Sequence, residues 1–180
     1  MKWKSDDRLT DLKLLLKKCE DVLERNWTGS FTIPAGTLYP YQWSWDAAFI
    51  AIGNSYGKTN RAIKEIEFLF NAQWKNGMFP HIVFNEKEKT YFPAADFYEI
   101  TRSKNAPPHI GTSGTTQPPV HAISCYYVYQ NFTNKTKARE FLVEIVPKLM
   151  NFHRYLLTCK DPEESGLVTI LHPWESGEDN

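Results

Sequence analysis

The order of apolar and polar positions in the first half of the chain predicts three helices. Across residues 6–25, leucines recur at steps of three and four with lysines and acidic residues between them, which is the pattern of an amphipathic helix. Residues 45–56 are apolar on nearly every side and predict a buried helix, and residues 62–70 form a second amphipathic stretch after a short connection. Two helices joined so closely are expected to pack as an antiparallel hairpin.

Two further helices are predicted in the second half. Thr116 precedes Gln117 and two prolines, and proline is tolerated in the first turn of a helix because the N–H groups there have no intrahelical partner. Thr116 is therefore expected to cap a helix that runs to about residue 132. A longer amphipathic helix is expected over about residues 136–158, with Pro147 inside it as the site of a kink.

The connections between these helices are long. Residues 76–93 predict a turn and a polar tip with a short extended piece at 81–84, and residues 94–116 show no sustained period. A loop as long as the second one is typical of a functional segment. No stretch alternates enough for a real sheet, and no repeat of fixed period is present. We therefore predict an all-α fold, either a closed toroid of helical hairpins or an irregular helical domain.

Composition narrows the class of partner. The 180 residues are 42% hydrophobic, and 21 Lys and Arg balance 21 Asp and Glu, so no net field favours nucleic acid or an anionic membrane. A neutral partner is expected. No run of about 18 apolar residues and no apolar leader is present, and three scattered cysteines do not form a disulfide framework. A cytoplasmic protein without a membrane partner is therefore expected.

The motifs of several common chemistries are missing. Residues 111–115, Gly-Thr-Ser-Gly-Thr, lack the Gly-Lys-Ser/Thr of a phosphate-binding loop and the final glycine of a nucleophile elbow. The five histidines never occur at the spacing of a helical metal pair. Metal and acyl-transfer chemistry are therefore disfavoured, and neither a metal nor a cofactor is expected.

Aromatic and carboxylate side chains occur together in four separated loops. These are residues 38–46, 76–84, 115–120 and 172–180, and each precedes or follows a predicted helix. If helical hairpins surround an axis, loops at the same end meet at one pocket. Flat aromatic faces beside polar side chains suit a polyhydroxylated ring. A small carbohydrate is therefore the expected ligand. The residues expected to meet are Trp43, Trp45, Asp46, Gln117, Trp174 and Asp179.

Four ordered motifs in these loops carry a family resemblance. They are Gln-Trp-x-Trp-Asp at 42–46, Gly-Met-Phe-Pro-His at 77–81, Thr-Gln-Pro-Pro at 116–119 and His-Pro-Trp-Glu-Ser-Gly-x-Asp-Asn at 172–180. Together they resemble glycoside hydrolase family 63, most closely its mannosylglycerate and glucosylglycerate hydrolases. The resemblance implies an inverting α-glycosidase and a partial (α/α)6 toroid. Residues 1–180 are then expected to be the truncated N-terminal part of one catalytic domain, with the C-terminal half as partner.

The resemblance also implies roles for individual residues. It places the general acid at Asp179. An inverting glycosidase needs a second carboxylate about 6.5–9.5 Å from the first, and no segment here resembles the motif that carries the family's base, so this fragment is expected to be inactive alone. The residues expected to bind the glycone are Trp45, Asp46, Trp174 and Gly177. The residues expected to face the leaving group are Tyr39, Trp43, His81 and Gln117, with Tyr91 on the loop between them.

Other interpretations remain open from the sequence. The chain could be a non-catalytic carbohydrate-binding protein, a trehalase-like or oligosaccharide α-glucosidase, or a helical scaffold in which Trp43 and Trp45 are core residues. Locally, Asp46 could only complement the dipole of its helix, and Gln117 could only be the first residue of its helix. Glu175 is interpreted as a structural acceptor for loop amides. An incomplete toroid is expected to expose apolar faces, so a homo-oligomer is also open.

Overall fold

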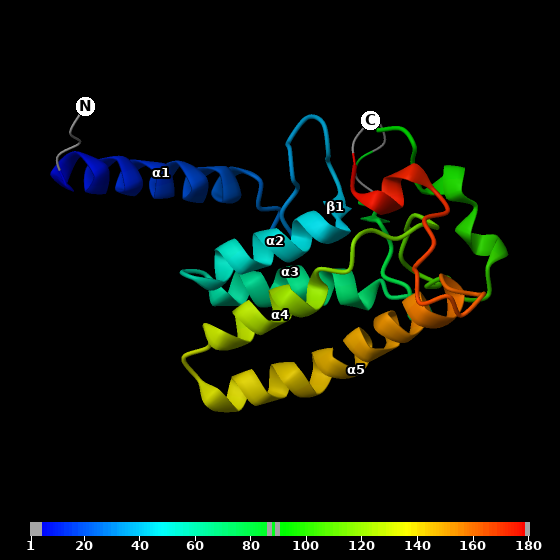
Figure 1. Cartoon of the computed structure of the whole chain (residues 1–180). Helices are drawn as coiled ribbons and strands as arrows, with labels where there is room; N and C mark the ends of the chain where they lie inside the picture. The colour runs from blue at the N-terminus through cyan, green and yellow to red at the C-terminus, as the bar shows by residue number, and fades with distance from the viewer. Residues whose placement is uncertain (1–4, 86–87, 89–90, 179–180) are drawn as a thin grey trace.

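The computed structural model of the chain describes residues 5–85, 88 and 91–178. Helices dominate these residues, which confirms the all-α prediction (Figure 1). The α-helices are α1 (Ser5–Arg25), α2 (Ser44–Ser55), α3 (Thr59–Asn71), α4 (His121–Gln130) and α5 (Lys135–Cys159). The short elements are the strands β1 (Gln42–Trp43) and β2 (Ile82–Val83) and the 3₁₀ helices η1 (Ala95–Tyr98), η2 (Ile100–Arg102) and η3 (Pro173–Ser176).

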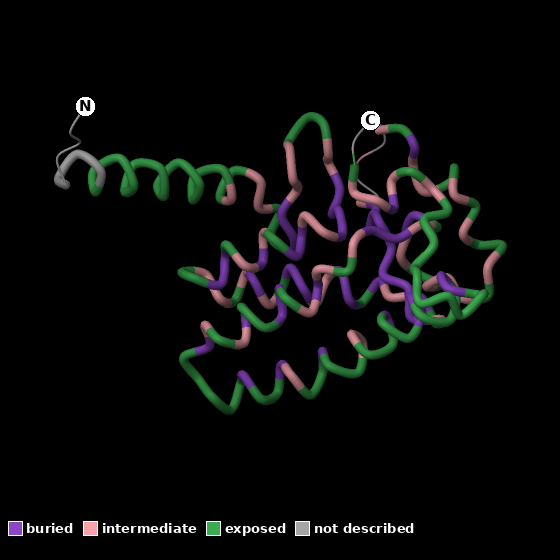
Figure 2. The backbone as a smooth tube through the Cα atoms, in the orientation of Figure 1, coloured by how far each residue is buried: buried purple, intermediate pink, exposed green. Residues whose placement is uncertain are grey.

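Helices α2 to α5 lie side by side and enclose the main core. The predicted hairpin is formed by α2 and α3, α4 packs on both of them, and α5 packs on α4 (Figure 1). Small residues of α2 and the apolar face of α3 are buried (Figure 2). They share one core with aromatic side chains of neighbouring elements, such as Phe79 and Phe152. Phe70 and Phe79 stack with ring centroids 4.2 Å apart. This packing fixes the helix ends from which the long loops emerge.

Helix α4 begins later than the sequence predicts. Its first residue is His121, so Thr116 does not cap it, and Gln117 lies outside the helix. A residue that precedes proline is sterically disfavoured in the helical region, and this applies to both Gln117 and Pro118. The Thr116 hydroxyl donates instead to the carbonyl of Phe79 at 2.8 Å. The segment before α4 is therefore tied to the 76–84 loop.

A small β-structure joins three of the loops. Strands β1 and β2 pair antiparallel, with Gln42 opposite Val83 and Trp43 opposite Ile82, and Val83 forms a further bridge to Thr112. The predicted extended piece at 81–84 is confirmed by β2, whereas β1 was not predicted. Because β1 continues directly into α2, this pairing sets where α2 begins.

Apolar faces are exposed on several elements, as predicted for an incomplete toroid. Helix α1 projects away from α2–α5, and its leucines between residues 9 and 16 are exposed (Figure 2). The base of α1 is held by Glu24, which pairs with Lys58 and Arg61. Further exposed apolar residues are Val143, Met150 and Leu157 on α5 and Leu167, Ile170 and Leu171 after it. In the part of the chain that the structure describes, no helix has the length and apolar character needed to span a bilayer.

A buried carboxyl group links the loop before β1 to α3. Glu65 Oε2 accepts from the backbone N–H of Thr32 at 2.8 Å, and Glu65 Oε1 accepts from Gln42 Nε2 at 2.7 Å. Gln42 Nε2 also donates to the carbonyl of Glu65 at 3.0 Å. Burial raises the pKa of Glu65 to about 7, although the bonds from Gln42 and Thr32 oppose that shift. Gln42 directly precedes Trp43, so the bonds between Gln42 and Glu65 also fix the position of Trp43.

We expect Glu65 to make stability fall as the pH rises from about 5 to 8. Its pKa is near 4.5 when unfolded and about 7 when folded, so the folded state loses stability as the pH rises from about 4.5 through 7. The full loss in the free energy of unfolding is on the order of 3 kcal/mol. Urea unfolding of wild type and Glu65→Gln at pH 5 and 8 measures it. The substituted amide loses one acceptor at every pH, so the readout is the difference between the two pH values, which should shrink in the variant.

Candidate functional site

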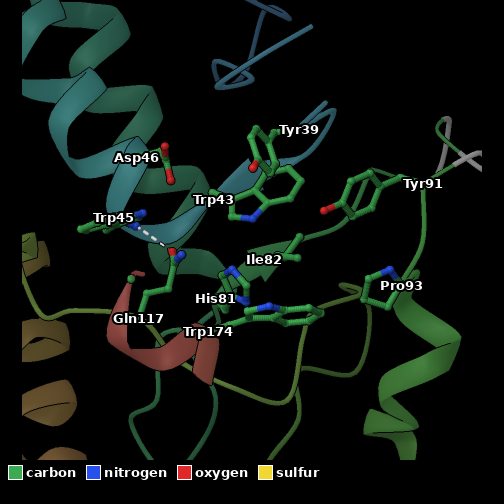
Figure 3. Close-up of a pocket in the computed structure, with 11 residues that line it drawn as sticks. Tyr39, Trp43, Trp45, Asp46, His81, Ile82, Tyr91, Pro93, Gln117 and Trp174 are labelled. Carbon is green, nitrogen blue, oxygen red and sulfur yellow. Dashed lines mark hydrogen bonds between the residues drawn. The ribbon is translucent and has the colours of Figure 1, made fainter. Parts of the chain in front are cut away.

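The loops at one end of the helices surround a cavity of about 210 Å³ (Figure 3). All nine residues that the sequence predicts for sugar binding line it, together with two that it did not single out, Ile82 and Pro93. The only signal for these two was their place beside His81 and close to Tyr91. The nine predicted residues are Tyr39, Trp43, Trp45, Asp46, His81, Tyr91, Gln117, Trp174 and Gly177.

The first turn of α2 is fixed by contacts from two other loops. The N–H of Ser44 donates to the carbonyl of His81 at 2.9 Å, and the N–H of Trp45 donates to Gln117 Oε1 at 3.2 Å. The side chains of Ser44 and His121 are 2.9 Å apart, Oγ to Nε2, and both are fully buried. Gln117 therefore satisfies a backbone donor at the start of α2, where Trp43 provides no side-chain cap.

Asp46 is placed by the same helix turn. It lies in the first turn of α2 and is half-buried, and Figure 3 shows its carboxylate directed toward the pocket. The positive end of the helix dipole favours a negative charge there. Asp46 can therefore accept hydrogen bonds from a ligand and stabilise its helix at the same time.

Aromatic rings form the walls of the pocket. Trp43 is 5% exposed and meets Tyr39 and Tyr91 edge-on, with ring centroids 5.0 and 5.5 Å away. Trp174, from η3, lies across the opposite side in Figure 3. The scaffold interpretation predicted that Trp43 and Trp45 are buried, which is true of Trp43 only, because Trp45 is half-buried. Both line the cavity, so the aromatic cluster is more than core packing.

His81 contributes a neutral ring to the pocket. Its imidazole centroid lies 6.5 Å from that of Trp43 and 5.8 Å from that of Trp174. Burial, with a further contribution from the nearby His172, lowers the pKa of His81 to about 4, against a smaller opposing effect of Glu175. Its buried Nδ1 has no partner among the described residues. At neutral pH this ring offers hydrogen bonding without a charge.

Gly177 closes the pocket against Trp45. Its φ is +78°, and a Cβ there would lie 2.9 Å from Trp45 Cη2 and 3.0 Å from Pro118 Cγ. Only glycine combines this conformation with this close approach. Asp179 follows two positions later and lies outside the described residues, so its predicted role stays a prediction. Glu178, between them in the sequence, is exposed.

Glu175 is a structural acceptor, as the sequence predicted. Its Oε2 accepts from the N–H of Leu171 at 2.8 Å, and its Oε1 bonds Lys160 Nζ at 2.6 Å. Among the residues that the structure describes, no group of three or more His, Cys, Asp or Glu side chains could hold a metal ion.

Comparison with known proteins assigns the chain to a family. Residues 39–180 match the family described as the mannosylglycerate hydrolase MGH1-like glycoside hydrolase domain. The chain belongs to this glycoside hydrolase family. Its membership confirms the resemblance carried by the four loop motifs, which all lie within the matched residues. The part of this glycoside hydrolase domain that the chain contains therefore includes the whole described pocket.

Named relatives agree with this family. The chain is 45% identical to the mannosylglycerate hydrolase of Rubrobacter radiotolerans, covering 92% of this chain and 38% of the relative. It is 44% identical to the glucosylglycerate hydrolase of Mycolicibacterium hassiacum, covering 88% and 37%. The family 63 mannosylglycerate hydrolase of Thermus thermophilus, crystallised with Tris and D-glycerate, matches with a TM-score of 0.82 at 47% identity, covering 92% of this chain and 38% of that one. The chain thus spans less than two fifths of the length of these glycoside hydrolases.

Proposed function

We propose that the whole protein, meaning this chain with the remainder of its catalytic domain, is an inverting α-glycosidase. Its proposed substrates are small α-mannosyl or α-glucosyl compounds of the glycerate-linked kind. The observation that carries the proposal is the meeting of four separated motif loops around one pocket with aromatic walls, a carboxylate and a neutral imidazole. The relatives' names support the same substrate class, as does the Thermus enzyme, which was crystallised with D-glycerate and separately with glucose.

The proposed substrate lies across Trp174 with its sugar at the end formed by α2. Figure 3 places Trp45 and Asp46 at one end of the pocket and Tyr91 and Pro93 at the other. In our proposal Trp45, Asp46, Trp174 and Gly177 bind the glycone, because a carboxylate and an indole face suit its hydroxyl groups and its apolar face. The residues that face the leaving group in this proposal are Tyr39, Trp43, His81, Tyr91 and Gln117.

Two carboxyl groups carry the proposed reaction. Asp179, which follows the pocket-lining Gly177 in the sequence, protonates the oxygen of the leaving group as the glycosidic bond breaks. A carboxylate on the opposite face removes a proton from the attacking water, at about 6.5–9.5 Å from the acid. We propose that this base belongs to the C-terminal part of an (α/α)6 toroid, so the chain alone is inactive. The cytoplasmic location and the homo-oligomer remain predictions from the sequence.

The stereochemistry of the first product tests the proposal. We expect proton NMR of the whole protein with α-mannosylglycerate or α-glucosylglycerate to show the β-anomer of the free sugar before mutarotation mixes the anomers. Trehalose serves as the comparison substrate and should turn over more slowly. Release of the α-anomer first would contradict inversion. Binding by calorimetry without cleavage would favour a non-catalytic carbohydrate-binding protein.

A further inference from the structure

A buried ion pair lies behind the pocket, at the end of α5. Lys160 follows the last residue of α5, and its Nζ lies 2.6 Å from Oε1 of Glu175 in η3. Each side chain is only 5% exposed. Neither residue lines the pocket, so neither belongs to the site described above.

Glu175 joins segments that carry pocket residues. Besides Lys160, its carboxylate accepts from the N–H of Leu171 at 2.8 Å and, through a longer bond of 3.5 Å, from the N–H of Thr116. Thr116 precedes Gln117, and Glu175 itself follows Trp174. The side chain of Glu175 therefore connects the segments that carry Gln117 and Trp174 to the end of α5.

The backbone of Lys160 is held as firmly as its side chain. Its N–H donates to the carbonyl of Leu156 at 3.3 Å, and its carbonyl accepts from Thr169 at 2.6 Å. The next residue, Asp161, accepts from the N–H groups of Ser165 and Gly166 at 2.8 and 2.7 Å. These bonds fix the backbone that carries the ammonium group of Lys160.

Stability alone does not account for such a pair. Removing two charges from water costs about as much as their attraction returns, and apolar residues of similar volume often stabilise a fold equally well. Burial by itself raises the pKa of Glu175, but the bonds from Lys160, Leu171 and Thr116 hold that pKa below its ordinary value. The carboxylate stays charged at neutral pH, and the three groups that donate to it approach from fixed directions. Such a directional contact fixes the position of η3, which carries Glu175, relative to the end of α5.

We infer that Lys160 and Glu175 form a positioning pair that sets Trp174, Gly177 and the segment leading to Asp179 relative to Gln117 and Trp45. The pair touches no substrate and acts through η3. The consequence for activity rests on the proposed glycosidase function, whereas the consequence for the backbone of η3 does not. Loss of Lys160 should let η3 shift, and a displacement of about 1 Å at a reacting group costs on the order of 10²-fold in rate.

The test compares Lys160→Met with a control variant, Ile145→Ala, in the whole protein. Ile145→Ala truncates a fully buried side chain of α5, the helix that ends just before Lys160, and Ile145 does not line the pocket. Both variants are assayed where unfolding curves show them to be folded. We expect Lys160→Met to lower kcat/KM for the glycerate-linked sugar on the order of 10²-fold, mainly through kcat, and Ile145→Ala to change it less than about threefold. Lys160→Arg, which keeps the charge and the donor, should recover most of the activity.

Hydrogen exchange gives a readout that does not depend on activity. Amides of residues 172 and 174–177 should exchange at least about tenfold faster in Lys160→Met than in Ile145→Ala. If Lys160→Met does not fold, Glu175→Gln replaces it, because that variant keeps the shape of the side chain. Equal exchange in the variant and the control, or equal kcat/KM, would overturn the inference. If the wild type cleaves no glycoside, the proposed function fails, and the exchange comparison still decides the positioning role.

Discussion

Asp179→Asn is expected to lower the kcat of the whole protein on its glycerate-linked sugar by about 10²–10⁴-fold. Asparagine has nearly the same size as aspartate but carries no acidic proton for the leaving oxygen. Substrate binding should stay close to that of the wild type, because the pocket walls are unchanged. Steady-state kinetics with α-mannosylglycerate and α-glucosylglycerate measure the loss, and calorimetry with the same compounds measures the binding.

A substrate that needs no proton isolates the acid's role. Fluoride leaves with little protonation, so Asp179→Asn should retain far more activity on the α-glycosyl fluoride than on the natural glycoside. Glu178→Gln is the matched control, because Glu178 is acidic, adjacent and exposed. It should behave like the wild type on both substrates. Near-normal turnover of the glycoside by Asp179→Asn, or an equal loss in Glu178→Gln, would remove Asp179 from the mechanism.

Asp46→Ala is expected to lower kcat/KM by about ten- to hundredfold. A hydrogen bond between a neutral group and a charged one contributes roughly 1.5–3 kcal/mol, and Asp46 is directed toward the pocket from the first turn of α2. The loss should exceed what the helix itself suffers, since a charge at a helix N-terminus contributes only about 0.3–1 kcal/mol to stability. Kinetics and urea unfolding of the same variant measure the two effects separately.

Asp46→Asn distinguishes ligand binding from helix stabilisation. Asparagine keeps the size and one acceptor but loses the charge, so its kcat/KM should fall between those of the wild type and Asp46→Ala. If Asp46 only complements the helix dipole, both variants lose stability and keep kcat/KM. That result would assign Asp46 to the fold and remove it from the proposed glycone site.

The convergence of the site could be predicted because it follows from local signals. Periodicity locates the helices, and turn residues locate the loops between them. Trp45 and Trp174 lie in the first and the last of the four motif loops, far apart in the chain. Both follow from motifs at loop ends that the hairpin arrangement brings together. The roles implied by the family resemblance then selected nine residues that line one pocket. The sequence therefore predicts which side chains line the pocket, although it does not predict their distances.

Contacts between distant segments could not be predicted in the same way. The two prolines before α4 are tolerated in a helical first turn, although the residue before each proline is sterically disfavoured in the helical region. The hydrogen bond from Thr116 to the carbonyl of Phe79, which ties this segment to a distant loop, has no signal in the sequence. The pairing of Lys160 with Glu175 has no periodic signal, since it joins a helix end to a loop. Burial of Glu65, which bonds Gln42 of β1, is likewise a tertiary property, because the amphipathic pattern of α3 gives no sign that this carboxyl group is buried. Side chains that hold loops in place emerge only from the folded structure.

A crystal structure of the whole protein carrying Asp179→Asn, soaked with α-mannosylglycerate, tests the central claim most directly. Our account predicts the sugar ring between Trp45 and Trp174 with a hydroxyl group bonded to Asp46. It also predicts the carboxamide of residue 179 within hydrogen-bond distance of the glycosidic oxygen. A sugar bound outside this pocket, or a residue 179 directed away from the glycosidic oxygen, would contradict it.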